Sequence, residues 1–501
     1  MDNNIANGEN GKTNATTTRR RMIPETGKII KFQHRESLLT QMLNNSSHIR
    51  TLHNLITGFV TIFLVATIAD YIKQPSKFRD EYETFLWNIA DFGRFIQIWL
   101  IMNLSVICLH YPLVLLNNFY QYRWLINNPE KDLDRLFEMY QKQKYSGWLQ
   151  QTFLYIAYAL ISFFGIFFYC TNRLIVLDIK ITGSFAALME MTRLLMKSHS
   201  FFIEKKDLQI EKEELVKLIA QKRQKHIIQS FWSSSSRARF RNLIYYLFSP
   251  TLIYSDHYPR TEKIRWSRVL NFGIQFIVAC LISFLILFRF VVATFSKTGI
   301  EPFPLNFNFI YKMLACGLAI YLLCFHGFLH TWHNFTAELI RFADRHYYDD
   351  HWNTTKLKDY YRKWNLIVQH WLYVYIFLPI HLRFHNRNLS NFSVILVSAI
   401  MHEYIINLSL RFFMPLNFLL FAVFAQMLYF FQKLDNGDKQ DNWKNIIFQT
   451  NIFIGWSLEI LFYSLEWYSR INCPLQVGFV DQEQSTIIEK LSPRFIHCVK
   501  F

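Results

Sequence analysis

Residues 388–412 read NLSNFSVILVSAIMHEYIINLSLRF. This block is long enough for a membrane-spanning helix, yet its centre places the imidazole of His402 beside the carboxyl group of Glu403. An ionisable side chain is expensive to bury in a membrane, so polytopic proteins keep one mostly at a substrate path, a proton relay or a helix–helix hydrogen bond. Ser398 shares a helix face with His402, where its hydroxyl can orient the ring or contact a ligand. A neutral imidazole there suits a general base that acts on an alcohol.

Apolar blocks of similar length occur throughout the chain of 501 residues. With 51% hydrophobic residues and a mean hydropathy of +0.09, the composition excludes disordered, collagenous and disulfide-framework proteins. Besides residues 388–412, eight blocks approach the length of a helical span: 54–72, 93–116, 148–170, 174–197, 266–295, 310–334, 413–433 and 444–468. The sequence therefore predicts an all-α, polytopic membrane protein with about nine transmembrane helices.

Two apolar segments fit this pattern less well. Block 174–197 is interrupted by four charged residues, which would have to face a protein interior or the interface: Asp178, Lys180, Glu190 and Arg193. A tenth apolar block, residues 365–382, is flanked by basic residues, and it can lie in the interface instead of crossing the membrane.

Basic residues gather between the apolar blocks and give a net charge of +17. Such a charge can attract nucleic acid, but here much of it lies in residues 198–265 and 335–387. Basic loops of this kind are typical of the cytoplasmic side, beside anionic lipid or a soluble anionic substrate, so we expect no nucleic-acid partner. An even number of crossings separates each loop from the N-terminus, which predicts a cytosolic N-terminus and a tail on the far side.

Three regions follow from this topology. Residues 1–50 form a cytosolic N-terminal segment, residues 51–468 the membrane domain and residues 469–501 a lumenal C-terminal tail. The polar start of the first region is expected to be largely disordered and lacks the apolar core of a cleaved signal peptide. Helical spacing of its Leu and Met residues predicts an amphipathic helix near 36–50.

Two of the seven cysteines, Cys473 and Cys498, lie in the tail after the last apolar block. A disulfide there is plausible if the tail faces an oxidising lumen. The other five cysteines lie in apolar stretches and lack the spacing of metal ligands, so a structural metal is not expected.

A second polar cluster comprises residues 342–353, FADRHYYDDHWN, and residues 360–365, YYRKWN. Composition alone allows an interfacial aromatic belt. Asn365 opens the tenth apolar block, where its amide can stabilise an oxyanion or simply cap a helix. The chain has no GxSxG, Walker-type, GxGxxG or HExxH motif, and a proton-coupled carrier or channel with an intramembrane histidine remains an alternative at this point.

The chain resembles the membrane-bound O-acyltransferase superfamily, and within it the sterol O-acyltransferase (acyl-CoA:cholesterol acyltransferase) branch. Residues 347–353 resemble the FYxDWWN signature, residues 401–404 the HEY of the catalytic helix, and residues 250–261, PTLIYSDHYPRT, the motif PTLxYxxxYPRT. Residues 196–201, MKSHSF, resemble MKxHSF of the sterol branch, in which the diacylglycerol branch lacks the histidine. The resemblance covers nearly the whole chain apart from its polar start.

The resemblance implies that His402 removes the proton from a sterol 3β-hydroxyl as this attacks the thioester of a long-chain acyl-CoA. Asn365 matches the family residue near the thioester carbonyl. Further residues match positions that contact acyl-CoA or sterol: His48, Arg362, Trp364, Gln369, Tyr373, Arg387 and Ser398. No metal or cofactor is implied, since acyl-CoA is a co-substrate. The family also has a disulfide at the positions of Cys473 and Cys498.

Three departures from the family affect the CoA side of the site. His351 replaces the first Trp of the signature, and Gln369, followed by His370, stands where the family has His. Asp359 replaces an Asn and would repel a nearby phosphate.

The resemblance further implies an enzyme of the endoplasmic reticulum membrane, surrounded by membrane lipid and assembled as a homodimer, with a homotetramer as the alternative. A diacylglycerol or long-chain-alcohol O-acyltransferase, and a catalytically weak sterol-binding member of the family, are the alternative functions.

Overall fold

The computed structural model describes residues 30–127, 148–206, 239–424, 442–473 and 493–499, together with residues 135 and 139. All regular secondary structure in these ranges is helical, and extended pairing there is limited to three isolated bridges. The all-α fold predicted from the apolar blocks is therefore confirmed. The polar start of the chain and most of its C-terminal tail lie outside the described residues.

Seven helical stretches in the described ranges are long and apolar enough to cross a membrane. They match seven of the nine predicted blocks: Ser47–Lys73, Pro75–Gln121, Leu149–Val176, Trp266–Phe295, Phe307–Leu339, Arg387–Leu410 and Asn442–Asn472. A helix suits these blocks because it satisfies its backbone hydrogen bonds internally, as a lipid environment demands. Block 413–433 is described only to residue 424, through α21 (Leu416–Phe418) and the π-helical η7 (Leu419–Phe424).

Block 174–197 overlaps α10 (Ile181–Lys205), which is not among these seven stretches. Two of the charges that interrupt it pair inside the protein. The Glu190 carboxylate accepts hydrogen bonds from Arg193 at 2.6 and 2.7 Å and from the Trp99 indole at 2.7 Å. The tenth block, 365–382, forms short helices that are also not among the seven: α18 (Leu366–Leu372), η6 (Tyr373–Phe377) and α19 (Leu378–Phe384).

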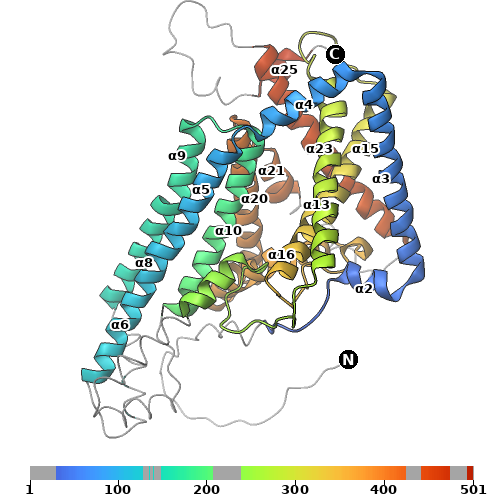
Figure 1. Cartoon of the computed structure of the whole chain (residues 1–501). Coiled ribbons are helices and arrows are strands. Elements are labelled where there is room, and N and C mark those ends of the chain that lie inside the picture. The colour runs from blue at the N-terminus through green and yellow to red at the C-terminus, as the bar shows by residue number, and fades with distance from the viewer. Residues whose placement is uncertain are drawn as a thin grey trace, which may run out of the picture.

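Figure 1 shows two groups of helices with α10 and α20 (Arg387–Leu410) between them. One group contains α5 (Phe92–Ser105), α6 (Tyr111–Asn127), α8 (Trp148–Ser162) and α9 (Tyr169–Val176). The other contains α3 (Ser47–Lys73), α13 (Trp266–Ile286), α15 (Phe307–Cys324) and α23 (Asn442–Asn472). At one end of the molecule lie α2 (Leu38–Asn45) and α16 (His333–Leu339), and at the other lies α25 (Phe495–Cys498).

Helices α15 and α23 approach each other closely at Gly317. A Cβ atom at Gly317 would lie 2.1 Å from Ser457 Oγ and 2.8 Å from the Ser457 backbone nitrogen. Small residues at a helix contact allow membrane helices to pack backbone against backbone. This contact sets α23 directly beside α15 and its aromatic residue Tyr321.

The segment in which an amphipathic helix was expected, residues 36–50, contains two helix pieces. Helix α2 ends at Asn45, and Ser46 caps α3 by accepting the Ile49 backbone N–H at 3.4 Å. The Arg50 side chain donates back to the carbonyl oxygens of Leu43 and Asn44, at 3.0 and 3.2 Å, and braces the corner between them.

Candidate active site

His402 lies in the second half of α20 with its side chain exposed. Its Nδ1 is 2.7 Å from the backbone carbonyl oxygen of Ser398, whereas the Ser398 hydroxyl is 3.5 Å away. A carbonyl oxygen only accepts hydrogen bonds, so Nδ1 carries the ring proton and donates it. Nε2 is therefore the unprotonated nitrogen, which is the form that a general base requires. Ser398 orients the ring mainly through its main chain.

Glu403, the neighbour of His402, connects three helices. Its carboxylate accepts the Phe418 backbone N–H at 2.8 Å and the Tyr463 hydroxyl at 3.3 Å. Asn417 donates to the same hydroxyl at 3.0 Å. Because these bonds join α20 to α21 and α23, the two adjacent polar residues of the HEY motif have separate tasks. The carboxylate holds the helices together and the imidazole is left available.

Asn365 lies at the junction between α17 (Leu357–Trp364) and α18. Its side-chain oxygen accepts the Val368 backbone N–H at 3.2 Å and caps α18. The next residue, Leu366, donates its backbone N–H to the Tyr347 carbonyl oxygen at 2.8 Å. Asn365 therefore caps a helix, which was one of its two predicted roles, and the cap uses only the oxygen of the amide. Within the part of the chain that the structure describes, the two N–H donors of the amide have no acceptor and are available for a ligand.

One aromatic residue, Phe421 of η7, connects His402 to the helix that precedes Asn365. The Phe421 ring stacks on the imidazole with centroids 5.3 Å apart and also contacts Tyr361 of α17 at 5.8 Å. The structure thereby brings α17 and α20 to the same aromatic side chain, although about forty residues separate His402 from Tyr361 in the sequence.

The loop that leads into α17 is packed by aromatic rings. Trp364 stacks on Tyr321 at 5.0 Å and on Tyr360 at 5.6 Å. The His351 ring meets Trp364 edge-on at 4.8 Å and is only 2% exposed. Burial lowers the pKa of His351 to about 4, so this ring is neutral at pH 7. The imidazole that departs from the family signature thus serves as a packing group, and Trp364 is mainly held by stacking.

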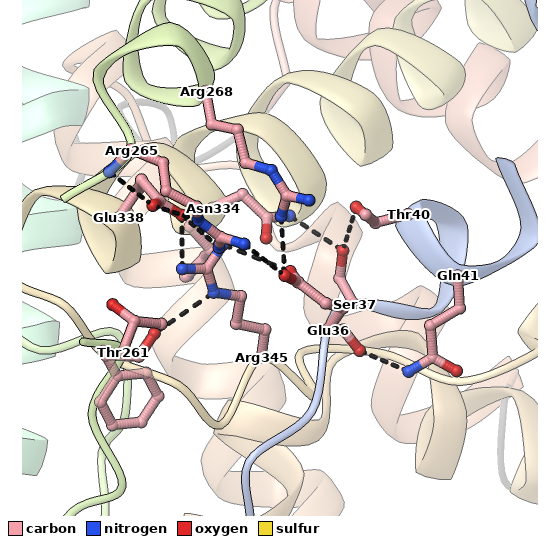
Figure 2. Close-up of polar contacts among 12 residues, drawn as sticks. Glu36, Ser37, Thr40, Gln41, Thr261, Arg265, Arg268, Asn334, Glu338 and Arg345 are labelled. Atoms are coloured by element: carbon pink, nitrogen blue, oxygen red, sulfur yellow. Dashed lines mark hydrogen bonds and ion pairs between the residues drawn. The ribbon is translucent and has the colours of Figure 1, made fainter. Parts of the chain in front are cut away.

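A buried ion network holds this loop against the N-terminal segment (Figure 2). Glu338 of α16 accepts two hydrogen bonds from Arg265, each at 2.7 Å, and one from Arg345 at 2.6 Å. Glu36 accepts from Arg268 at 2.7 Å, from Arg265 at 3.0 Å and from Arg345 at 3.4 Å. Arg345 lies two residues before Tyr347, whose carbonyl oxygen accepts the first backbone N–H of α18, so the network supports the junction at Asn365.

The electrostatics of Glu36 reflect this network. Burial alone raises the pKa of the Glu36 carboxyl group, but the guanidinium groups of Arg345, Arg265 and Arg268 outweigh it, so the pKa is lowered overall. Arg35, the residue before it, forms an ion pair with Asp344 and exchanges backbone hydrogen bonds of 2.9 and 3.0 Å with Ala343 and Arg345. The N-terminal segment is therefore a fixed part of the fold from residue 35 onward.

A cationic cluster lies where α17 approaches the start of α20. Burial and the positive charges of Arg362 and Arg387 lower the pKa of Lys358, which shows that these three cations share one region. Arg387 is the first residue of α20, after the capping residue Asn386. Asp359 partly offsets the positive potential at Lys358. Two predicted CoA contacts, Arg362 and Arg387, are thus brought together.

Other predicted substrate contacts are less closely connected to this site. His48 is exposed in the first turn of α3, and Tyr373 stacks on Phe377 at 5.4 Å. Gln369 makes no side-chain hydrogen bond within the described ranges. Burial, with His346 and Arg35 nearby, lowers the pKa of His370 to about 4, so His370 does not supply the positive charge that Gln369 lacks.

The MKSHSF motif contacts both the loop at residues 250–261, where the Tyr254 backbone N–H donates to Ser200 Oγ at 2.8 Å, and the helix after Asn365. Lys197, which is 1% exposed, donates to the carbonyl oxygens of Tyr246, Leu247 and Ser249. The ring of His199 contacts Trp371 at 5.8 Å and Tyr375 at 5.4 Å, and its Nδ1 is 3.2 Å from the Tyr158 hydroxyl. The motif that distinguishes the sterol branch therefore packs against α18 and η6.

The tail contains the expected disulfide between Cys473 and Cys498. Gly299 packs against it with a φ of +81°, and a Cβ atom there would lie 2.3 Å from Cys498 Sγ and 2.6 Å from Cys473 Sγ. Asn472 donates to the carbonyl oxygens of Ser296 and Thr298, both at 2.8 Å. The disulfide thus joins α25 to the end of α23, and Asn472 holds this end of α23 against the loop after α14 (Ala293–Phe295).

Sequence reasoning missed Glu459, a carboxyl group within α23. It lies near the middle of the apolar block 444–468, and a charged residue at that depth of a predicted span is a signal that the sequence contains. It was overlooked because it belongs to none of the family motifs.

The fold and these side chains agree with a comparison of the sequence with family models. Residues 85–465 match the membrane-bound O-acyltransferase family, and the chain belongs to this family. It is a multi-pass membrane O-acyltransferase, so the resemblance first read from the motifs is confirmed.

The relatives found by sequence comparison have a more specific activity in their names. Sterol O-acyltransferase 1 of Mus musculus is 29% identical over 482 residues, which cover 95% of this chain and 80% of that protein. Sterol O-acyltransferase 2 of Homo sapiens is 29% identical over 483 residues, which cover 95% of this chain and 81% of that protein. Sterol O-acyltransferase 2 of Rattus norvegicus is 28% identical over 500 residues, with 97% and 84% coverage.

Proposed function

We propose that this protein is an acyl-CoA:sterol O-acyltransferase, which transfers a long-chain fatty acyl group to a sterol 3β-hydroxyl. The observation that carries the catalytic part is the hydrogen bond from His402 Nδ1 to the Ser398 carbonyl oxygen. It leaves Nε2 unprotonated on an exposed side chain in a membrane helix. Nearly full-length similarity to sterol O-acyltransferases supports the acceptor.

In the proposed reaction, His402 Nε2 takes the proton of the acceptor hydroxyl while its oxygen attacks the thioester carbonyl carbon. The resulting tetrahedral oxyanion receives hydrogen bonds from the N–H groups of the Asn365 amide. The oxygen of the same amide accepts the Val368 backbone N–H, and this helix cap fixes the orientation of the amide. Collapse of this intermediate breaks the carbon–sulfur bond, and the imidazolium returns its proton to the CoA thiolate. The products are an ester and free CoA.

The cationic cluster of Lys358, Arg362 and Arg387 supports the proposed position of CoA. Guanidinium groups bind phosphates through charge-assisted hydrogen bonds. Arg387 and His402 are fifteen residues apart on one helix, which corresponds to about 22 Å along its axis. In this arrangement the phosphates bind at the start of α20, and the extended arm of the molecule carries the thioester along the helix toward His402.

The position of the MKSHSF motif supports a sterol acceptor, because His199 packs against the helical segment that follows Asn365. We further propose that the protein resides in the endoplasmic reticulum membrane as a homodimer, with a cytosolic N-terminus and a lumenal tail. The separation of α2 and α25 at opposite ends of the molecule supports this orientation (Figure 1). A disulfide near α25 agrees with an oxidising compartment on that side.

The test uses microsomes from cells that lack their own acyltransferases and express this chain, with labelled oleoyl-CoA and either cholesterol or diacylglycerol. We expect labelled steryl ester from the wild type and from His34→Ala, which changes an exposed histidine, and none from His402→Ala. Label in triacylglycerol alone would replace the sterol by diacylglycerol as acceptor. A correctly inserted wild-type protein that forms no ester would favour a sterol-binding role.

A further inference from the structure

Glu459 lies on the face of α23 that looks toward the candidate active site. Trp456, three residues before it, and Tyr463, four residues after it, share this face because of the helical repeat. Tyr463 donates its hydroxyl to Glu403, the neighbour of His402. Trp456 contacts Tyr321 at 5.9 Å, and Tyr321 stacks on Trp364, the neighbour of Asn365.

These contacts position Glu459 between the two ends of the site. About one turn toward the N-terminus of α23, Trp456 connects through Tyr321 to Trp364, the neighbour of Asn365. About one turn toward the C-terminus, Tyr463 binds Glu403, the neighbour of His402. Glu459 also interacts electrostatically with Glu403 and with Tyr361, and Tyr361 contacts the Phe421 ring that stacks on His402. Elements from both sides of the site therefore surround this carboxyl group.

Within the described ranges, the Glu459 carboxyl group has no hydrogen-bond donor and no cation as a partner. Two other carboxyl groups in the membrane-spanning stretches are buried and satisfied: Glu466 accepts from Arg470 at 2.6 Å, and Glu81 accepts from Arg289 at 2.8 Å. An unsatisfied polar group in a protein interior is costly, and an ionisable residue inside a membrane protein commonly marks a substrate site. Glu459 differs from Glu466 and Glu81 because no donor or cation within the described ranges satisfies its carboxyl group.

We propose that Glu459 hydrogen-bonds the hydroxyl of the acceptor alcohol and holds it beside His402, a role that rests on the proposed acyltransferase function. An acceptor hydroxyl has one O–H donor, which is directed to His402 Nε2, and two lone pairs. One lone pair attacks the thioester and the other accepts a hydrogen bond from the carboxylic acid O–H. Glu459 thus recognises the only polar group of an otherwise apolar lipid alcohol.

This role requires the acid form of the carboxyl group, whose donor an amide can replace. The test compares E459Q, which keeps a donor and an acceptor but never ionises, with E459L, which has neither. A second apolar variant, E459M, has a flexible unbranched side chain and serves if leucine disturbs packing. N451L changes an exposed residue of the same helix and is the matched control.

Steady-state kinetics are measured on full-length protein in lipid, with separate titrations of cholesterol and oleoyl-CoA. We expect E459L and E459M to raise the KM for the acceptor about tenfold while the KM for oleoyl-CoA is unchanged. E459Q and N451L are expected to remain close to wild type. The melting temperatures of E459L and E459M should equal or exceed that of wild type, because an unpaired polar group has been removed. A merely structural carboxyl group would give the opposite stability result.

An acceptor KM in E459L and E459M that matches wild type would overturn the role of Glu459 and leave the proposed function intact. So would a loss of acceptor affinity in E459Q as large as that in E459L, because it would show that the donor is not what matters. If wild-type protein forms no ester with any alcohol, the proposed function fails first and the role of Glu459 fails with it.

Discussion

The guanidinium group of Arg345 donates a 2.6 Å hydrogen bond to the Glu338 carboxylate, and the two side chains are 1% and 0% exposed. Neither charge can be satisfied by water, so each depends on the other and on the remaining members of the network in Figure 2. The pair joins α16 to the loop that supports Asn365. Its integrity is therefore a condition for the geometry of the site.

Removal of Glu338 should show how far the fold depends on the ion network. Glu338→Ala leaves the buried Arg345 and the partly exposed Arg265 without their main acceptor, and we expect a loss of about 3–5 kcal/mol in the free energy of unfolding. The double variant Glu338→Leu, Arg345→Met removes both charges and should lose less than the sum of the losses in Glu338→Leu and Arg345→Met alone. Thermal melting of protein in detergent provides the comparison. Additive losses would show that the two residues are not coupled.

Asn365→Asp separates the cap of α18 from the role in catalysis. The carboxylate retains an oxygen for the Val368 N–H but has no amide donor, so we expect the melting temperature to hold while kcat falls about 10²–10³-fold. Asn365→Ala should lose both stability and activity. Full kcat in the Asp variant would assign Asn365 to capping alone.

Arg387→Ala should weaken acyl-CoA binding. Loss of a charge-assisted hydrogen bond to phosphate is expected to raise the KM for oleoyl-CoA about tenfold without changing the KM for the acceptor. Arg383→Ala, which removes an exposed cation at the end of α19, serves as the control. Equal effects of the two variants would indicate a general electrostatic attraction instead of a phosphate site.

Gly299→Ala should destabilise the end of the molecule that contains the Cys473–Cys498 disulfide. Its positive φ and the nearby sulfur atoms both oppose a Cβ atom, and we expect a cost of about 1–3 kcal/mol. Gly58→Ala provides the contrast, because α3 leaves open space around Gly58 and alanine favours the helix. A melting temperature of Gly299→Ala equal to wild type would mean that the loop moves away from the disulfide without strain.

His351 should make stability depend on pH. Its folded pKa of about 4 lies below the ordinary value of 6.5, so the unfolded chain binds more protons between these values. Stability is unaffected above pH 6.5 and is lost as the pH falls toward 4, by up to about 3 kcal/mol from this residue. His351→Phe should show a correspondingly smaller loss between pH 7 and pH 4 in the same melting assay. Identical pH profiles of wild type and His351→Phe would show that His351 binds a proton in the folded protein as readily as in the unfolded chain.

The sequence by itself predicts the membrane helices and the polar residues of the site. Blocks such as 54–72 and 266–295 are apolar over the length of a span with few charged residues, and an α-helix satisfies its own backbone hydrogen bonds in lipid. His402 is recognisable because an imidazole in such a block is costly. Local composition decides these features, so a single sequence is sufficient to find them.

Features that depend on contacts between distant segments were decided only by the tertiary structure. The sequence left Asn365 with two possible tasks, and the folded chain shows that the cap uses the oxygen of its amide, whose N–H groups have no acceptor within the described ranges. It placed Glu403 beside His402, yet packing against Phe418 and Tyr463 separates their roles. The role proposed for Glu459 depends on the contacts of α23 with α15 and α20. Hydrogen-bond partners and burial depend on contacts between two segments. The apolar periodicity of one segment does not predict them.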